Sequence, residues 1–194
     1  MGRQIEFDTQ NALNKAMRLF WRKGYSSVSL KELLGEMEIL NGSFYNSFGS
    51  KQSVFIAALK NYVDGVVSKR LEIIGSKATL KEGLGEYFKT LLESCEMEDK
   101  PKGCMFLNLL SGGAKENAEA TALLQGELKK VEDYLLEQVV QAKKRGEFFL
   151  DVDERAMALL IITYIKGLTS MDCIGRPVSD LRGQAQIFIN SVMK

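Results

Sequence analysis

Residues Gly24–Lys51 read GYSSVSLKELLGEMEILNGSFYNSFGSK and predict two short helices separated by a tight turn. The first begins after Ser29, whose hydroxyl can accept a hydrogen bond from the backbone N–H of Glu32, and Glu32 completes a capping box. The second covers approximately residues 40–47, and Ser50 caps a longer helix after it. Two short helices preceded by a longer one form the helix-turn-helix arrangement.

The rest of the chain is also predicted to be helical. A helix from about Asp8 to Lys23 precedes the motif, because its apolar residues recur at helical spacing on one face. Another helix extends from Lys51 to about Ile74. The chain has only two prolines, so long helices can continue without interruption. Further helices are expected at approximately residues 79–97, 101–110, 116–145, 153–174 and 179–192.

These patterns predict an all-α protein with two domains. Residues 1–50 are expected to form an N-terminal three-helix helix-turn-helix domain, and residues 51–194 a larger helical C-terminal domain. The length of 194 residues and the apolar content of 45% are sufficient to bury a core. The chain lacks an Asn-Gly or Asp-Gly turn between two alternating apolar runs, which would indicate a β-hairpin.

The composition excludes several classes of enzyme. The chain contains no histidine, so it cannot build a Ser-His-Asp or Cys-His nucleophile or a zinc site with spaced histidines. Its three cysteines, Cys95, Cys104 and Cys173, lack the Cys-x-x-Cys spacing and are odd in number. A secreted domain held by disulfides is therefore not expected. We expect a non-enzyme with neither a metal nor a cofactor.

The sequence also predicts where the protein is located. The N-terminal residues MGRQIEFDTQ lack the charged and then apolar pattern of a signal peptide. The most apolar run, Ala156 to Ile165, spans ten residues and is too short to cross a bilayer. We therefore expect a cytoplasmic protein with no membrane partner. Residues 1–60 carry a net charge of +3 and the remainder −2, which favours an anionic partner for the N-terminal part.

The motif resembles the TetR family of bacterial transcription regulators. The resemblance covers approximately residues 10–60, and the rest of the chain agrees with the family in length and helical content. It implies a dimeric regulator that binds a DNA operator, most often a repressor that a small molecule releases. The residues that match the family pattern are Ala16, Leu19 and Phe20, then Gly24-Tyr25, Ser29-Leu30, Gly42-Ser43-Phe44-Tyr45-Asn46-Ser47-Phe48 and Ser50-Lys51.

The second short helix carries small and polar side chains that suit the major groove of DNA. Phe44 and Phe48 are four residues apart and are expected to face the core, which leaves the polar residues outside. Asn41 can bind an adenine edge with two hydrogen bonds, and Ser43 can contact either kind of base. Gly42 lets the backbone approach the DNA closely.

Other side chains are expected to contact phosphates rather than bases. Tyr45 offers a hydroxyl, and Lys51 offers an ammonium beside the exposed amides of the following helix. Such contacts fix the position of the protein on double-stranded DNA. The complete set predicted to bind DNA is Ser29, Asn41, Gly42, Ser43, Tyr45, Asn46 and Lys51.

Two positions depart from the family pattern. Glu38 occupies the turn position where the family usually has glycine, so a positive φ would be costly there. Leu40 occupies the cap of the recognition helix, where it supplies no side-chain acceptor. These departures support an alternative, a helical ligand-binding or chaperone-like module whose motif no longer binds DNA.

The resemblance implies that the C-terminal domain dimerises through its last two helices. Here an apolar stripe formed by Leu159, Ile162, Ile165, Ile187 and Val192 is suited to a four-helix interface, although part of it can also be intrachain core. A helix-turn-helix protein needs a partner to cover a palindrome, so we expect a homodimer.

The resemblance also implies a pocket for a small-molecule effector in the C-terminal domain. Aromatic and soft side chains on its central helices favour an apolar or aromatic ligand, although ordinary core packing also accounts for them. Cys104 is a separate possibility, either a buried thiol or a reactive one, and a small enzyme that uses it would lack a histidine to activate it. The predicted pocket residues are Tyr87, Phe88, Met105, Phe106, Tyr134, Tyr164 and Met171.

Overall fold

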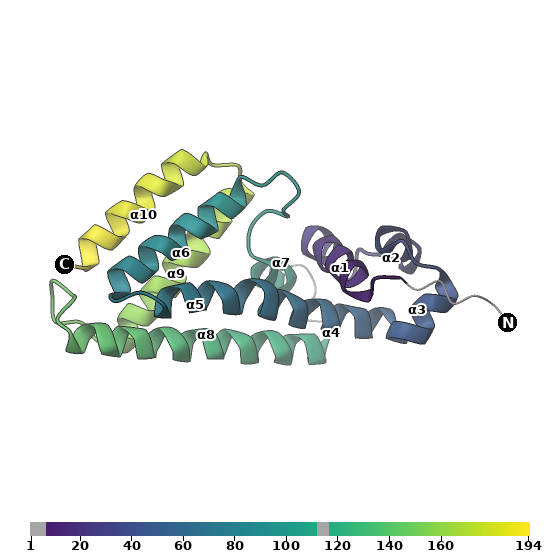
Figure 1. Cartoon of the computed structure of the whole chain (residues 1–194), viewed down its shortest axis with the longest axis horizontal. Helices are drawn as coiled ribbons and strands as arrows, with labels where there is room; N and C mark the ends of the chain where they lie inside the picture. Colours follow the sequence, from purple (N-terminus) through teal and green to yellow (C-terminus); the bar gives the residue numbers. More distant parts are fainter. Residues whose placement is uncertain (1–6, 112–116) are drawn as a thin grey trace. The chain divides into compact units, whose positions relative to one another are not determined.

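A computed structural model of the chain describes residues 7–111 and 117–194. Helices make up the regular structure of these residues, apart from an isolated bridge between Phe148 and Met193, so the all-α prediction is confirmed. The helices are α1 (Thr9–Lys23), α2 (Leu30–Met37), α3 (Asn41–Phe48), α4 (Lys51–Tyr62), the π-helical segment η1 (Val63–Ser68), α5 (Lys69–Gly75), α6 (Leu80–Cys95), α7 (Met105–Ser111), α8 (Ala118–Lys144), α9 (Glu154–Cys173) and α10 (Val178–Val192) (Figure 1).

The chain forms two compact units. The N-terminal unit comprises Met1–Gly65 and Met105–Leu124, and the C-terminal unit comprises Val66–Cys104 and Gln125–Lys194. Helix α4 therefore packs with the N-terminal helices, and α7 joins them from later in the chain. The predicted boundary between residues 50 and 51 separates a DNA-binding domain from a ligand-binding domain. It remains a prediction, because the two units are defined by packing and not by function.

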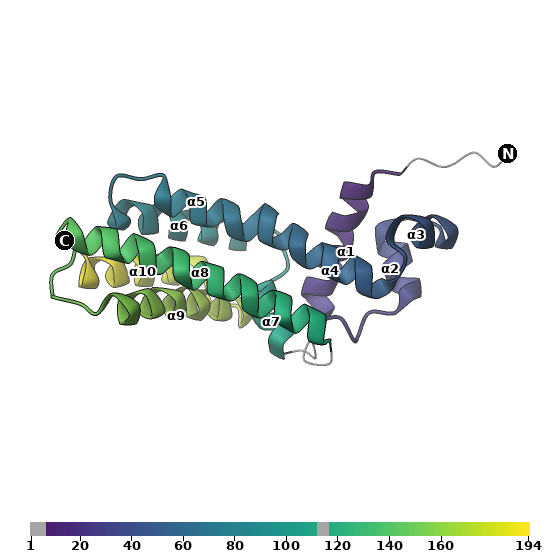
Figure 2. The same cartoon turned by 90° about the horizontal axis from the view of Figure 1, so that it is seen from below.

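In the N-terminal unit, α1 is the central helix and packs against α2, α4 and α7 (Figure 2). Its first turn is capped by Asp8, whose carboxylate accepts a hydrogen bond from Asn11 N–H, and Gly24 ends it with a positive φ. Aromatic rings fill the centre of this unit. Phe20 meets Phe55 edge-on with ring centroids 5.1 Å apart, so the packing of α1 against α4 determines where α3 is held.

The predicted continuous α-helix from Lys51 to about Ile74 is corrected by the structure. The backbone is helical through this range, but η1 (Val63–Ser68) is π-helical between α4 and α5. A π-helical turn accommodates an extra residue, so the apolar face after it has a different register from the face before it. The spacing of apolar residues alone does not reveal such a change.

In the C-terminal unit, α6 packs against both α5 and α10 (Figure 1). A complete capping box begins α6, in which Thr79 and Glu82 satisfy each other's backbone N–H groups. Gly83 allows α5 and α6 to approach closely, because a Cβ atom there would lie 2.4 Å from the carbonyl oxygen of Ile74. Large apolar side chains of α6, α9 and α10 then form one continuous core.

One predicted helix start differs from the structure, and another lies outside the described residues. Helix α7 begins at Met105 rather than Pro101, because Gly103 has a φ of +76° and its N–H bonds to the carboxylate of Asp172. Glu116, the predicted start of the long helix after it, lies outside the described residues.

Helix α9 is long and apolar enough to span a membrane by length and composition alone, a property that core helices of soluble proteins share.

Candidate functional site

Helix α3 is anchored to the core by one fully buried aromatic ring, and most of its other residues face solvent. Phe44 is fully buried, with its ring centroid 5.4 Å from that of Tyr45 and 6.0 Å from that of Phe48. Phe48 is half-buried, so the predicted inward face is confirmed for Phe44 and partial for Phe48. The exposed residues of this helix are Asn41, Gly42, Tyr45, Asn46 and Ser47, and Ser43 is half-buried.

The turn between α2 and α3 accommodates Glu38 in the left-handed conformation. Its φ of 57° and ψ of 40° lie in the left-handed region, which glycine adopts more easily than other residues. Among the described residues, Glu38 alone has a positive φ without being a glycine. Its backbone N–H bonds to the carbonyl of Gly35, and its carboxylate pairs with Lys15 at 2.6 Å. The ion pair offsets part of the negative charge that Glu38 brings to this surface.

Leu40 precedes α3 and occupies its N-cap position. Its carbonyl accepts a hydrogen bond from Phe44 N–H at 2.9 Å, so the backbone begins the helix without help from a side chain. The side chain itself is 66% exposed. An exposed apolar group beside a groove-facing helix can contact the methyl group of thymine. The sequence marks Leu40 as a missing cap, and its apolar character is the signal for such a contact.

Lys51 lies at the first turn of α4 with its ammonium above an aromatic ring. Its Nζ atom is 4.4 Å from the centroid of Tyr25, and partial burial lowers the pKa of Lys51. Ser50 caps the helix by accepting a hydrogen bond from Ser53 N–H. This arrangement leaves the first-turn amides of α4 beside a cation, a combination that suits a phosphate.

Helix α2 is held to α1 by ion pairs. Arg22 contacts Glu36 at 2.6 Å, and Lys23 contacts Glu32, whose pKa is lowered chiefly by the hydrogen bond from that lysine. Ser29 caps α2 through Glu32 N–H, as predicted, whereas the Glu32 carboxylate pairs with Lys23 rather than completing the capping box. These contacts orient α2 and, through the turn, the exposed face of α3.

Comparisons with known proteins agree with this geometry. The model for bacterial regulatory proteins of the tetR family matches residues 12–58, and a tetracyclin repressor-like C-terminal domain model matches residues 81–176. The chain belongs to the TetR family. The described helices therefore carry the helix-turn-helix domain and the helical C-terminal domain of a DNA-binding transcription regulator.

Several relatives extend over most of the chain. The uncharacterized HTH-type transcriptional regulator YezE of Bacillus subtilis is 28% identical, and the alignment covers 88% of this chain and 91% of YezE. The HTH-type transcriptional repressor ComR of Escherichia coli is 27% identical, over 87% of this chain and 80% of ComR. A solved structure of a cysteine mutant of the TetR family regulator CifR, complexed with 26-bp double-strand operator DNA, has a TM-score of 0.88 at 25% identity and covers 98% of this chain and 100% of CifR.

The residues predicted to line a TetR effector pocket are dispersed between the two units. In the C-terminal unit, Phe88 contacts the rings of Tyr87 and Tyr164, with centroids 5.8 and 5.6 Å apart. Burial raises the pKa of Tyr87 to about 12, so this phenol stays neutral. The Tyr134 hydroxyl donates to Leu71 O at 3.1 Å. The effector pocket remains a prediction.

The other predicted pocket residues have different surroundings. Met105 and Phe106 are buried in the N-terminal unit, where the Phe106 ring lies 5.3 Å from that of Tyr62. Met171 is an exposed residue of α9. These side chains share an aromatic or soft character, but residue type alone does not show which face of a helix carries each of them.

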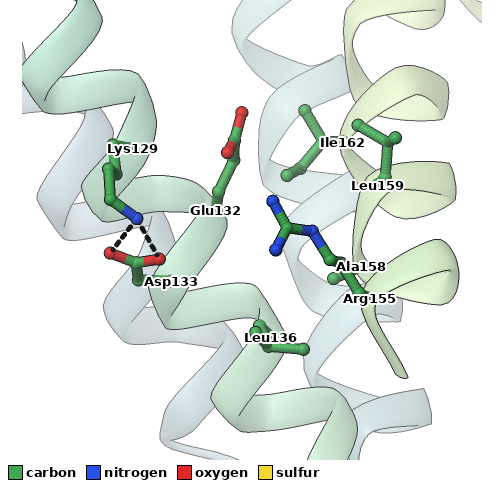
Figure 3. Close-up of a pocket in the computed structure, with 8 residues that line it drawn as sticks. All are labelled: Lys129, Glu132, Asp133, Leu136, Arg155, Ala158, Leu159 and Ile162. Atoms are coloured by element: carbon green, nitrogen blue, oxygen red, sulfur yellow. Dashed lines mark hydrogen bonds and ion pairs between the residues drawn. The ribbon is translucent and has the colours of Figure 1, made fainter. Parts of the chain in front are cut away.

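A groove of about 300 Å³ lies between α8 and α9 in the C-terminal unit (Figure 3). Charged side chains occupy the α8 side, where Lys129 pairs with Asp133 at 2.9 Å. The Arg155 side chain extends from α9 towards α8. This charged lining differs from the apolar pocket that was predicted. Its described lining residues are Lys129, Glu132, Asp133, Leu136, Arg155, Ala158, Leu159 and Ile162.

Helices α9 and α10 each present large apolar side chains to solvent. Leu159 is 57% exposed and Ile187 is 68% exposed. Ile165 is buried within the chain, which assigns it to intrachain core, and Ile162 and Val192 are half-buried against that core. We call the residues Leu159, Leu160, Met171 and Ile187 the apolar face.

Proposed function

We propose that the chain is a cytoplasmic homodimeric repressor that reads an operator with α3 and releases it when a small effector binds the C-terminal unit. The observation that carries the proposal is the exposed polar surface of α3, anchored by the fully buried Phe44. Relatives support it, since ComR is named as a repressor and CifR is described in complex with operator DNA. We assign no catalytic role to any residue.

Within α3, base reading is assigned to Asn41 and Ser43. Both lie in the first turn of the helix, where recognition helices approach base edges, and Asn41 is exposed. Gly42 is exposed and has no side chain, so it adds no bulk between them. Tyr45 and Lys51 are assigned to phosphates, because a phenol at the middle of α3 and an ammonium at the start of α4 position the protein without reading sequence.

The apolar face supports a homodimer through α9 and α10. Leu159 and Ile187 are each more than half exposed, so α9 and α10 both leave large apolar surface in water on a monomer. A second copy of the chain offers the same face and buries both. Dimerisation would pair two α3 helices, as a palindromic operator requires.

Selection of bound duplexes from a random DNA library tests the proposal directly. The expected result is an enriched near-palindrome with two half-sites about one helical turn apart. The Asn41→Ala protein serves as the matched variant, because it leaves Phe44 and the helix caps unchanged. Failure of the unmodified protein to retain any duplex at low salt would refute the DNA-binding role and favour the chaperone-like alternative.

A further inference from the structure

The groove between α8 and α9 has the size of a site for one small molecule. Its volume of about 300 Å³ lies at the lower end of the range for small-molecule pockets. Both of its walls belong to the C-terminal unit, so the groove is formed within one compact body. Figure 3 shows that α8 and α9 direct charged side chains into the same space above an apolar floor. The chemistry of these walls and of the floor restricts what the groove can bind.

The four charged side chains of the groove form two groups. The Nζ atom of Lys129 lies 2.9 and 3.1 Å from the two carboxylate oxygens of Asp133, so these charges neutralise each other. Glu132 extends from α8, and the Arg155 guanidinium extends from α9 towards it. Within the part of the chain that the structure describes, neither of these two side chains forms an ion pair or a hydrogen bond. The groove therefore offers one carboxylate and one guanidinium to a ligand.

The floor of the groove is apolar. Leu136 and Ile162 are half-buried and pack against the core of the C-terminal unit, and Ala158 is part of that core. The small side chain of Ala158 leaves room between the two larger ones. Leu159 also lines the groove, but it belongs to the apolar face, so we assign the site to the other residues. A ligand with an apolar group gains free energy by covering this floor.

The pair of opposite charges selects against ligands that carry one kind of charge. A simple anion would be attracted by Arg155 and repelled by Glu132, and a simple cation would experience the reverse. A zwitterion satisfies both side chains. The planar guanidinium can donate two parallel hydrogen bonds to a carboxylate, and a carboxylate accepts hydrogen bonds from an ammonium. A direct pair between these two exposed side chains would contribute little, so a ligand can replace it at small cost.

We propose that this groove binds an apolar α-amino acid as its zwitterion. Arg155 holds the α-carboxylate, Glu132 holds the α-ammonium, and the apolar side chain covers Leu136 and Ile162. An α-amino acid carries both charges on one carbon and projects its side chain from the same carbon, which matches two charged walls above one apolar floor. Binding itself is independent of DNA. The further step, that this ligand is the effector, rests on the proposed function.

Calorimetric titration of the full-length protein with L-leucine tests the ligand class. Three analogues each lack one feature: L-leucinamide has no carboxylate, 4-methylpentanoate has no ammonium, and glycine has no apolar side chain. We expect leucine to bind at least tenfold more tightly than each analogue, because each lost contact is a charge-assisted hydrogen bond or buried apolar area. Absence of leucine binding, or equal affinities for leucine and leucinamide, would overturn the proposal.

Two variants assign the contacts. Arg155→Met should bind leucine about tenfold more weakly and lose the preference for leucine over leucinamide. Glu132→Gln should keep that preference and lose the preference for leucine over 4-methylpentanoate. Arg176→Met and Glu137→Gln are the matched controls, because both residues are exposed and neither is among the described lining residues. Equal weakening of every ligand in Arg155→Met would contradict the carboxylate contact, since a general disturbance of the groove acts on all ligands alike.

Operator affinity at saturating leucine tests the effector role. A fluorescence titration should show the Kd for the selected operator rising about tenfold with leucine and remaining unchanged with glycine. The operator should in turn weaken leucine binding by the same factor. An unchanged operator Kd with leucine bound would refute the effector role. If the protein binds no duplex, the proposed function fails, while calorimetry with leucine and its analogues still decides the amino-acid site.

Discussion

Helix α3 and the pair α9–α10 both present side chains to solvent, but those side chains have opposite chemistry. The exposed residues of α3 are mainly small and polar, and one buried ring, Phe44, holds the helix in place. Helices α9 and α10 expose Leu159 and Ile187 while their other faces fill the core. A polar surface matches the base edges and phosphates of DNA, and an apolar surface matches another protein surface.

This difference also separates stability from function in the two regions. The polar residues of α3 contribute little to folding, so their substitution should change DNA binding with little change in stability. The most exposed residues of the apolar face, Leu159 and Ile187, contribute little to the core of a monomer, so their substitution should change association. Substitution of the buried residues beneath these two surfaces should lower the free energy of unfolding.

The largest effect is expected from Phe44→Ala. Removing the fully buried ring that anchors α3 should cost about 3–5 kcal/mol of unfolding free energy and abolish operator binding. Chemical denaturation followed by circular dichroism measures the loss. Phe149→Ala is the control, because Phe149 is exposed and its removal should change stability by less than about 0.5 kcal/mol. Equal losses in both variants would show that α3 is not anchored as described.

The next largest effect is expected from Ile187→Asp. A carboxylate in an apolar dimer interface should cost several kcal/mol, so the dimer should dissociate into folded monomers with weakened operator binding. Analytical ultracentrifugation measures the mass, and circular dichroism checks the fold. Leu150→Asp places the same charge on an exposed apolar residue outside α9 and α10 and should leave the dimer intact. Persistent dimers of Ile187→Asp would move the interface elsewhere.

A smaller and more specific effect is expected within α3. Asn41→Ala should lose about 1–3 kcal/mol of discrimination at one base pair of the operator, because a bidentate contact reads an adenine. Tyr45→Phe should instead weaken binding to all duplexes alike, because a phosphate contact carries no sequence information. Repeating the duplex selection with each variant separates the two. An unchanged selected motif for Asn41→Ala would remove it from base reading.

The smallest effect is expected at the turn. Glu38→Gly should raise the unfolding free energy by about 1 kcal/mol, because glycine adopts a φ of 57° without strain. The lost ion pair with Lys15 is solvent-exposed and offsets only part of this gain. Glu36→Gly, within helix α2, should instead lower stability by about 1 kcal/mol. Thermal melts that show both variants destabilised would contradict the account of the turn.

The helix-turn-helix was predictable because its signals are local. Ser29 and Ser50 cap α2 and α4 through the backbone N–H groups expected from sequence, and the strained position of Glu38 follows from a missing glycine. Such signals depend on neighbouring residues alone. The start of α7 was not predictable in this way, because it depends on Asp172, which is 69 residues from Gly103 in the chain.

The candidate sites also differ in whether local sequence signals predict them. Gly42 and Asn46 are exposed because helical periodicity places them opposite Phe44, and Asn41 is exposed because it begins the helix. The predicted pocket residues share only a residue type, and Met105 lies in a different unit from Phe88.

The affinity of the protein for its selected operator, measured against salt concentration, tests the central claim most directly. The claim is that α3 reads DNA sequence while the surrounding cations hold phosphates. We expect log Kd to rise with log salt with a slope of about 0.9 for each phosphate contact, and the selected duplex to bind about a thousandfold more tightly than a scrambled duplex. Equal affinity for the selected and scrambled duplexes at every salt concentration would contradict the claim.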